Sequence, residues 1–124
     1  MDNVEIKESL VSPKVVLNKD SGIFEIRGNS YMSNPTPLYE LIENWLKEYV
    51  GNPPAKTVFS FDMEYVNTAT VKLLSELIKL LVSIRTKEKE IVIKWCCSDD
   101  DEDMLELGKQ FEKINNFKFE WTIR

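Results

Sequence analysis

The sequence predicts an α/β fold with a mixed, mostly parallel sheet, an N-terminal hairpin and about three helices mainly on one face. After two short apolar runs at 15–17 and 23–26, stretches of strand and helix periodicity alternate to the end of the chain. Such alternation implies right-handed crossovers between parallel strands. In the stretches 57–63 and 117–123, apolar and polar side chains alternate, which indicates that one face of the sheet is open to water.

The bulk properties fit a single domain over residues 1–124. The chain is 43% hydrophobic and 30% charged, and its net charge is −5. An acidic chain disfavours nucleic acid and anionic membrane surfaces as partners. The first residues lack the basic start and apolar core of a signal peptide, and no apolar run approaches the roughly 20 residues of a membrane helix. We therefore expect a cytoplasmic protein without membrane insertion.

The first half of the chain contains the hairpin and one helix. Residues 1–12 predict a loose arm or an edge strand, and the turn-rich residues 19–22 separate the two strands of the hairpin. Residues 28–35 contain Gly, Asn, Ser and Pro, which favour a loop. Pro37 suits the first turn of a helix, whose apolar stripe continues to Tyr49.

The second half alternates strands with helices. A strand through residues 57–62 leads to a long apolar helix that leaves from Val71 and continues to Ile84. The width of its apolar surface predicts the most buried helix of the fold. The remaining elements are a strand at 91–95, an acidic loop at 98–103, a helix with apolar positions from Met104 to Ile114, and a strand at 117–123.

The connection between the strand at 57–62 and the helix that leaves from Val71 is the candidate functional site. Asn67, Thr68 and Thr70 are small polar residues that cap helices by accepting hydrogen bonds from free N–H groups. A hydroxyl there is exposed on a rigid base, beside the positive end of the helix dipole, where an added anion is tolerated. We interpret the connection as a phosphorylation switch at Thr68; an ordinary N-cap is the alternative.

The content of histidine and cysteine argues against catalysis and metal binding. The chain has no histidine, which removes the commonest zinc ligand and the usual base of a nucleophile pair. Cys96 and Cys97 are adjacent, and neighbouring side chains of a strand point to opposite faces, so they do not suit one metal ion. We expect two small buried cysteines, no metal, no cofactor and no enzymatic activity.

The order of elements resembles the STAS domains of anti-sigma-factor-antagonist type, which place a phosphorylatable hydroxyl where a strand meets a helix. Three pieces of sequence, taken in order, resemble more closely the SiaC family of regulatory phosphoproteins, over nearly the whole chain. They are Gly28-Asn29-Ser30-Tyr31 followed by a Pro and by Trp45-Leu46-x-x-Tyr49; Tyr65-Val66-Asn67-Thr68-Ala69-Thr70-x-Lys72-Leu73-Leu74; and Trp95 followed by Asp101-Glu102-Asp103-Met104-x-Glu106-x-Gly108-x-x-Phe111.

The resemblance implies a cytoplasmic bacterial signalling protein. A partner kinase would phosphorylate it on Thr, a PP2C-like phosphatase would reverse this, and the unphosphorylated form would bind and activate a diguanylate cyclase. The family motif, approximately Tyr-Phe-Asn-Thr-Ser-Ser, places its Thr on Thr68. Here Val66 replaces the aromatic residue, and Ala69 and Thr70 replace the two serines, so Thr70 is a second candidate phosphoacceptor.

The partner-binding surface is expected in the connections, where binding residues concentrate. The acidic run at 99–103 has two interpretations: a solvated helix start stabilised by the dipole, or a patch for a partner, which the resemblance favours. The candidate partner-binding residues are Tyr31, Tyr65, Asn67, Thr68, Thr70, Lys72, Asp101, Glu102 and Asp103.

Two other functions fit parts of the same sequence. Asp62 and Glu64, with Asp101 or Asp103, could form a small carboxylate or Mg²⁺-dependent site, because ligand sites favour the carboxyl edge of parallel strands. The absence of histidine and of a Gly-rich phosphate loop stands against it. The remaining alternative is a plain protein-interaction module without a switch.

Overall fold

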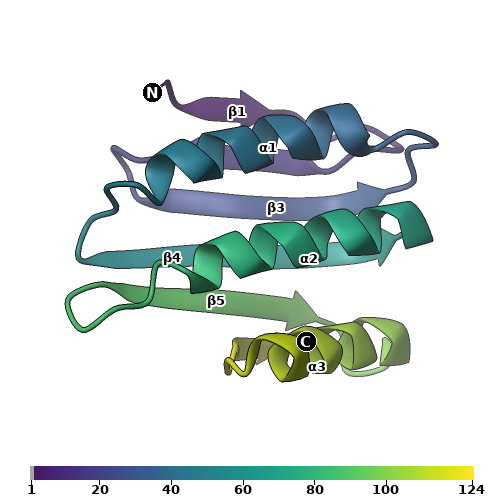
Figure 1. Cartoon of the computed structure of the whole chain (residues 1–124). Coiled ribbons are helices and arrows are strands. Elements are labelled where there is room, and N and C mark those ends of the chain that lie inside the picture. The colour runs from purple at the N-terminus through teal and green to yellow at the C-terminus, as the bar shows by residue number, and fades with distance from the viewer. Residues whose placement is uncertain (1) are drawn as a thin grey trace.

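The six strands of the sheet follow one another in chain order in the computed structural model, which describes residues 2–124 (Figure 1). The first three strands are antiparallel and the later neighbours are parallel, which confirms the mixed sheet with an N-terminal hairpin. The elements are β1 (Val4–Ile6), β2 (Lys14–Asn18), β3 (Ile23–Ser30), α1 (Thr36–Tyr49), β4 (Lys56–Val66), α2 (Thr68–Val82), β5 (Glu90–Cys97), α3 (Glu102–Asn115) and β6 (Glu120–Ile123).

The arm expected at residues 1–12 contains the edge strand β1, which pairs antiparallel with β2. Met1 lies outside the described residues. None of the helices within residues 2–124 has the length and hydropathy to cross a bilayer.

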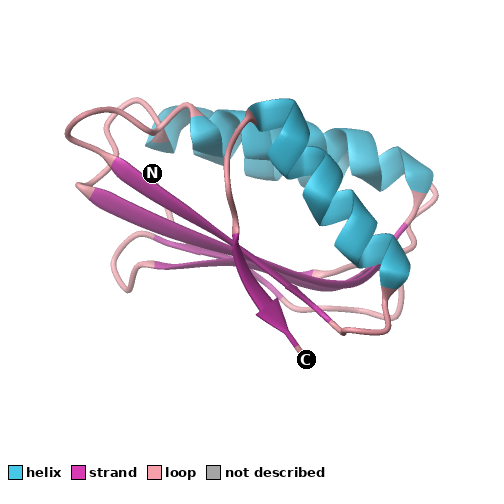
Figure 2. Cartoon of the chain, turned by 90° about the horizontal axis from the view of Figure 1, so that it is seen from below, coloured by secondary structure: helices cyan, strands magenta, loops and turns pink. Residues whose placement is uncertain are grey.

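All three helices lie on one side of the sheet, as the alternation predicted (Figure 2). In β4, Phe59, Phe61 and Met63 face the helices and are buried, whereas Ser60 and Asp62 face the other side. Charged side chains of the sheet lie on the open face, where several of them form ion pairs. These pairs are Lys14–Glu25 at 3.5 Å, Lys94–Glu120 at 3.8 Å and Arg124–Asp62 at 2.7 Å.

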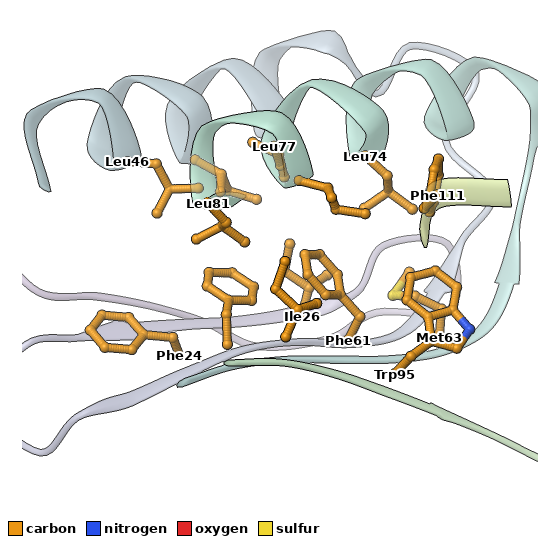
Figure 3. Close-up of a cluster of buried hydrophobic side chains, with 14 of the residues drawn as sticks. Phe24, Ile26, Leu46, Phe61, Met63, Leu74, Leu77, Leu81, Trp95 and Phe111 are labelled. Carbon is orange, nitrogen blue, oxygen red and sulfur yellow. The ribbon is translucent and has the colours of Figure 1, made fainter. Parts of the chain in front are cut away.

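The core fills the space between the sheet and the helices (Figure 3). Leu74, Leu77 and Leu81 of α2 are almost fully buried. α1 and α2 each have five buried residues, so the prediction that α2 is the most buried helix is not confirmed. The three leucines pack above aromatic side chains of the sheet, where Phe61 meets Trp95 at 5.9 Å between ring centroids. Each fully buried side chain of this size contributes about 1.5–3 kcal/mol to the free energy of folding.

Several element boundaries differ from the sequence prediction. β3 runs to Ser30, inside the segment expected as a loop, and β4 runs to Val66. The cause is tertiary: parallel pairing of the two strands satisfies backbone groups that a loop would leave to water. α2 begins at Thr68, three residues before the expected Val71, because Asn67 caps it. β6 begins only at Glu120, since Asn116 ends α3 in the left-handed conformation and residues 117–119 connect the two.

The two cysteines differ in burial, so the expectation that both are buried is correct for Cys97 alone. Cys97 is 1% exposed on the helix side, whereas Cys96 is half-buried on the open face. Burial raises the pKa of the Cys96 thiol above its usual value, and the Asp62 carboxylate raises it further. Burial also raises the pKa of Cys97. Both thiols therefore stay protonated at neutral pH.

Helix α3 rests on two tryptophans through Gly108. The indole Nε1 of Trp95 donates to the carbonyl of Met104 at 3.0 Å, one turn before this glycine. A Cβ at position 108 would lie 2.6 Å from Cη2 of Trp121 and 2.7 Å from Nε1 of Trp95. Glycine is therefore required for the close approach of α3 to β5 and β6, not for an unusual backbone angle.

We expect Gly108→Ala to lower the free energy of unfolding by about 1–3 kcal/mol, because overpacking outweighs the better helix propensity of alanine. The measurement is urea unfolding followed by tryptophan fluorescence. Lys109→Ala, at an exposed position of the same helix, is the control and should change the value by less than about 0.5 kcal/mol. Equal stability of Gly108→Ala and the unmodified protein would contradict this packing.

Candidate phosphorylation site and partner surface

The strand β4 carries one extra residue just before the junction with α2. Gly28 pairs with Met63 and Asn29 pairs with Tyr65, so the register passes over Glu64. Such a bulge bends the strand and re-aims the side chains around it. Without it, strict alternation would place Glu64 on the open face beside Asp62. With it, Glu64 lines a groove against α3 instead.

The side chain of Asn67 fixes the start of α2. Its Oδ1 accepts from the backbone N–H of Thr70 at 3.0 Å and from the Thr70 hydroxyl at 2.6 Å. Its Nδ2 donates to the carbonyl of Met32 at 2.8 Å. One side chain thus caps the helix and also holds the loop between β3 and α1.

Behind Asn67 lies a buried chain of hydroxyl groups. Tyr39 Oη donates to Ser30 Oγ, and Ser30 Oγ lies 2.7 Å from Thr70 Oγ1. The Thr70 proton is committed to Asn67, so Ser30 must donate to Thr70, since each hydroxyl has one proton. Burial raises the pKa of Tyr39 to about 12, although the bond to Ser30 lowers it somewhat. Tyr39 therefore stays a donor at neutral pH.

The two candidate phosphoacceptors are in opposite environments. Thr68, the first residue of α2, is exposed, and Lys72 is exposed one turn further along. Thr70 is 0% exposed, and its hydroxyl already has two hydrogen-bonding partners. Thr68 therefore carries the accessible hydroxyl of the junction, while Thr70 belongs to the packed interior and is not available to a partner.

Two tyrosines stand beside the junction on neighbouring strand ends. Tyr31 and Tyr65 stack with 4.4 Å between ring centroids and 15° between planes, and they are 50% and 42% exposed. The backbone N–H of Tyr31 donates to the carbonyl of Val11 at 2.8 Å, which brings the exposed Leu10 and Val11 to the same end of the molecule. An exposed apolar patch thus lies at the end of the sheet where α2 begins.

The acidic segment has a structural and an exposed part. Asp101 is the N-cap of α3 and accepts from the backbone N–H of Met104 at 3.1 Å. Glu102 and Asp103, in the first turn, are exposed. The β5–α3 connection, the junction and the loop with Tyr31 all lie at the end where β3, β4 and β5 finish (Figure 1). The structure thus brings the predicted site residues, other than buried Thr70, to one edge.

The carboxylates of the alternative enzyme site are not assembled. Asp62 lies on the open face and binds Arg124 at 2.7 Å, whereas Asp101 caps a helix on the other side of the sheet. Within residues 2–124 there is no group of three acidic, cysteine or histidine side chains placed to hold a metal ion. This arrangement offers no shared metal or acid–base position for Asp62 with Asp101 or Asp103.

Sequence reasoning missed two sets of residues. Ser30 and Tyr39 complete the hydroxyl chain, but they come from a strand and a helix distant in sequence from Thr70. Glu106 and Gln110 line the groove beside the junction, together with Glu64, which the sequence offered only for the alternative enzyme site. The spacing of Asp103, Glu106 and Leu107, which places them on one helix face, is the signal that could have indicated the α3 side of that groove.

These features define a small α/β protein with an accessible threonine at the first position of α2, at the edge of the sheet where the connections after β3, β4 and β5 meet. The family model for "SiaC family regulatory phosphoprotein" matches residues 6–123, and the chain belongs to that family.

Solved structures of SiaC from Pseudomonas aeruginosa have the same fold. Apo-SiaC aligns with a TM-score of 0.83 and 18% identity, covering 100% of this chain and 99% of that one. A chain from the crystal structure of diguanylate cyclase SiaD in complex with its activator SiaC, from the same organism, aligns with the same TM-score and identity, covering 97% of each. No curated protein sequence matches the chain.

We expect Thr70→Val to lower the free energy of unfolding by about 1–3 kcal/mol, because the change removes the acceptor of the buried Ser30 hydroxyl and one of the two donors to Asn67 Oδ1. The isosteric change Thr68→Val, at the exposed position, should alter it by less than about 0.5 kcal/mol. Urea denaturation of both variants gives the comparison. A larger loss for Thr68→Val than for Thr70→Val would contradict the assigned roles.

Proposed function

We propose that this chain is a cytoplasmic bacterial phosphorylation switch that acts by binding and not by catalysis. A partner kinase phosphorylates Thr68, a PP2C-like phosphatase removes the phosphate, and the unphosphorylated form binds and regulates a diguanylate cyclase. The observation that carries the proposal is the contrast at the junction: Thr68 is exposed at the first position of α2, and Thr70 is buried and hydrogen-bonded.

The family and its structural relatives support this choice of effector. The chain belongs to a family of regulatory phosphoproteins. A relative of the same fold, SiaC, is the activator of the diguanylate cyclase SiaD. The absence of histidine and the raised pKa values of both cysteine thiols favour a binding protein over an enzyme.

The start of α2 suits a phosphorylated threonine. The first N–H groups of a helix have no intrahelical acceptor, and the positive end of the dipole favours an anion. Lys72, one turn along and exposed, is placed to pair with the phosphate. The Asn67 cap and the hydroxyl chain lie on the inner side of the helix start, so they are undisturbed. The fold should therefore survive phosphorylation.

Phosphorylation of Thr68, which the fold tolerates, is expected to weaken binding of the effector protein. The effector would dock on the end of the sheet that carries the neutral Thr68 hydroxyl and the exposed rings of Tyr31 and Tyr65. A phosphate adds a charge of about −1.5 to −2 at neutral pH. Burying a charge without compensation costs several kcal/mol, and each 1.4 kcal/mol is a factor of ten in affinity. Phosphorylation should therefore weaken binding by about two decades or more.

We expect Thr68→Ala to bind the cyclase like the unmodified protein and to resist the kinase. Thr68→Glu should weaken binding, though less than phosphorylation does, because glutamate carries less charge. The measurements are phosphosite mapping after purification from native cells and binding titrations with the cyclase that co-purifies.

Thr70→Ala is the matched control and should be phosphorylated to the same extent at Thr68. Thermal melts check that each variant is folded. Equal binding by the phosphorylated and unphosphorylated forms would refute the switch. Loss of phosphorylation in Thr70→Ala but not in Thr68→Ala would move the site to Thr70.

A further inference from the structure

A groove of about 360 Å³ separates α3 from the junction of β4 and α2. Its floor is apolar and is formed by Val66, Val71, Met104 and Leu107. Its rim is formed by exposed polar side chains, among them Glu64, Asp103, Glu106 and Gln110, together with Asp101 and the exposed ring of Tyr65. The groove therefore continues the surface formed by the two stacked tyrosines.

One face of α3 supplies most of this lining. Asp103, Glu106, Leu107 and Gln110 recur at spacings of three and four residues, so they form a single stripe along the helix. The opposite wall comes from the end of β4, where the bulge turns Glu64 away from the open face. The acidic rim is thus assembled from two elements far apart in the sequence.

The charge of the rim is uncompensated. The groove is lined by four carboxylate side chains and by no lysine or arginine. The ion pairs found within the described part of the chain use other carboxylates: Glu25, Glu43, Glu76, Glu120 and Asp62. Asp101 is occupied as the cap of α3, and Glu64, Asp103 and Glu106 take part in none of these ion pairs. An apolar floor with such a rim complements a cationic, partly apolar partner.

We propose that this groove binds a helical segment of the effector protein that presents apolar side chains flanked by lysine or arginine. The inference rests on the proposed function in so far as it takes the effector to be the occupant. Helix-in-groove docking supplies apolar anchors for such a floor, and the flanking cations pair with the rim. The volume lies at the low end for small-molecule pockets, which fits side chains inserted from a second protein.

The groove is distinct from the switch in its response to charge. Thr68 does not line it. A phosphate on Thr68 makes this edge of the molecule more acidic, so the edge would attract a cationic segment more strongly. The loss of effector binding on phosphorylation therefore arises at the surface formed by Tyr31 and Tyr65. The groove still attracts the cationic segment of the effector after phosphorylation.

The test is a titration of the ¹⁵N-labelled protein with a synthetic Leu/Lys amphipathic peptide of about 15 residues, a length at which helices become marginally stable. A Leu/Glu peptide with the same apolar face is the matched probe. We expect the Leu/Lys peptide to shift the amide signals of Glu64, Val71 and Leu107, with weaker binding as salt is raised above about 0.15 M. The Leu/Glu peptide should shift none of them.

Two variants with the same change in net charge separate the groove from general attraction. Glu106→Lys, on the rim, should weaken binding of the Leu/Lys peptide about fivefold or more. Glu40→Lys, at an exposed position of α1, should leave binding within about twofold. Thermal melts confirm folding, and Glu64→Gln gives a second rim change without charge reversal. Any of three results would overturn the proposal. They are equal binding of the two peptides, an equal loss of affinity for the Leu/Lys peptide in Glu106→Lys and Glu40→Lys, and shifts of amide signals confined to the open face of the sheet.

Phosphorylation distinguishes this proposal from the proposed function. With Thr68 phosphorylated, the Leu/Lys peptide should bind as tightly as before or more tightly, while the effector dissociates. If Thr68 is never phosphorylated in cells but the Leu/Lys peptide occupies the groove, the proposed phosphorylation switch is refuted and the proposed binding function of the groove is supported. If Thr68 controls the effector but the peptide does not bind the groove, the groove proposal is wrong.

Discussion

The junction between β4 and α2 depends on the amide side chain of Asn67. It accepts from the backbone and the hydroxyl of Thr70 and donates to the carbonyl of Met32, so it joins the helix start to the loop beside Tyr31. A buried polar group left unpaired costs about 1–3 kcal/mol, so these partners hold one another in place. The loop and the helix start therefore form one rigid unit, and an exposed hydroxyl on this unit has a fixed position.

The same geometry separates two hydroxyls only two residues apart. Successive residues of a helix are about 100° apart around its axis, so Thr68 and Thr70 point in nearly opposite directions. Thr70 faces the sheet and completes the chain from Tyr39 through Ser30. Thr68 faces solvent, beside a patch of aromatic surface. A group added to Thr68 alters the surface without entering the core, which is what a reversible modification requires.

Charge is distributed unequally over the molecule. On the open face, acidic side chains form ion pairs with cations across the sheet. Lys94–Glu120 joins neighbouring strands, and Arg124, just after β6, pairs with Asp62 of β4. At the carboxyl edge of the sheet, Glu64, Asp103 and Glu106 surround an apolar floor without such partners. Exposed ion pairs contribute little to stability, so this contrast in charge bears on partner binding more than on the stability of the fold.

The sequence alone determined the features encoded within a few neighbouring residues. The helix and strand periodicities, the buried character of α2, the capping residues of the junction and the family motifs are local patterns, and they predicted the fold class and Thr68. The tertiary structure decided the features that depend on contacts between segments distant in the sequence. The register of β3 against β4 created the bulge that moves Glu64 into the groove, and lengthened both strands. The burial of Thr70 depends on Ser30 and Tyr39, and the pairing of Asp62 depends on Arg124 at the other end of the chain. No local pattern contains these contacts, because the residues that make them come together only when the sheet and its helices have assembled.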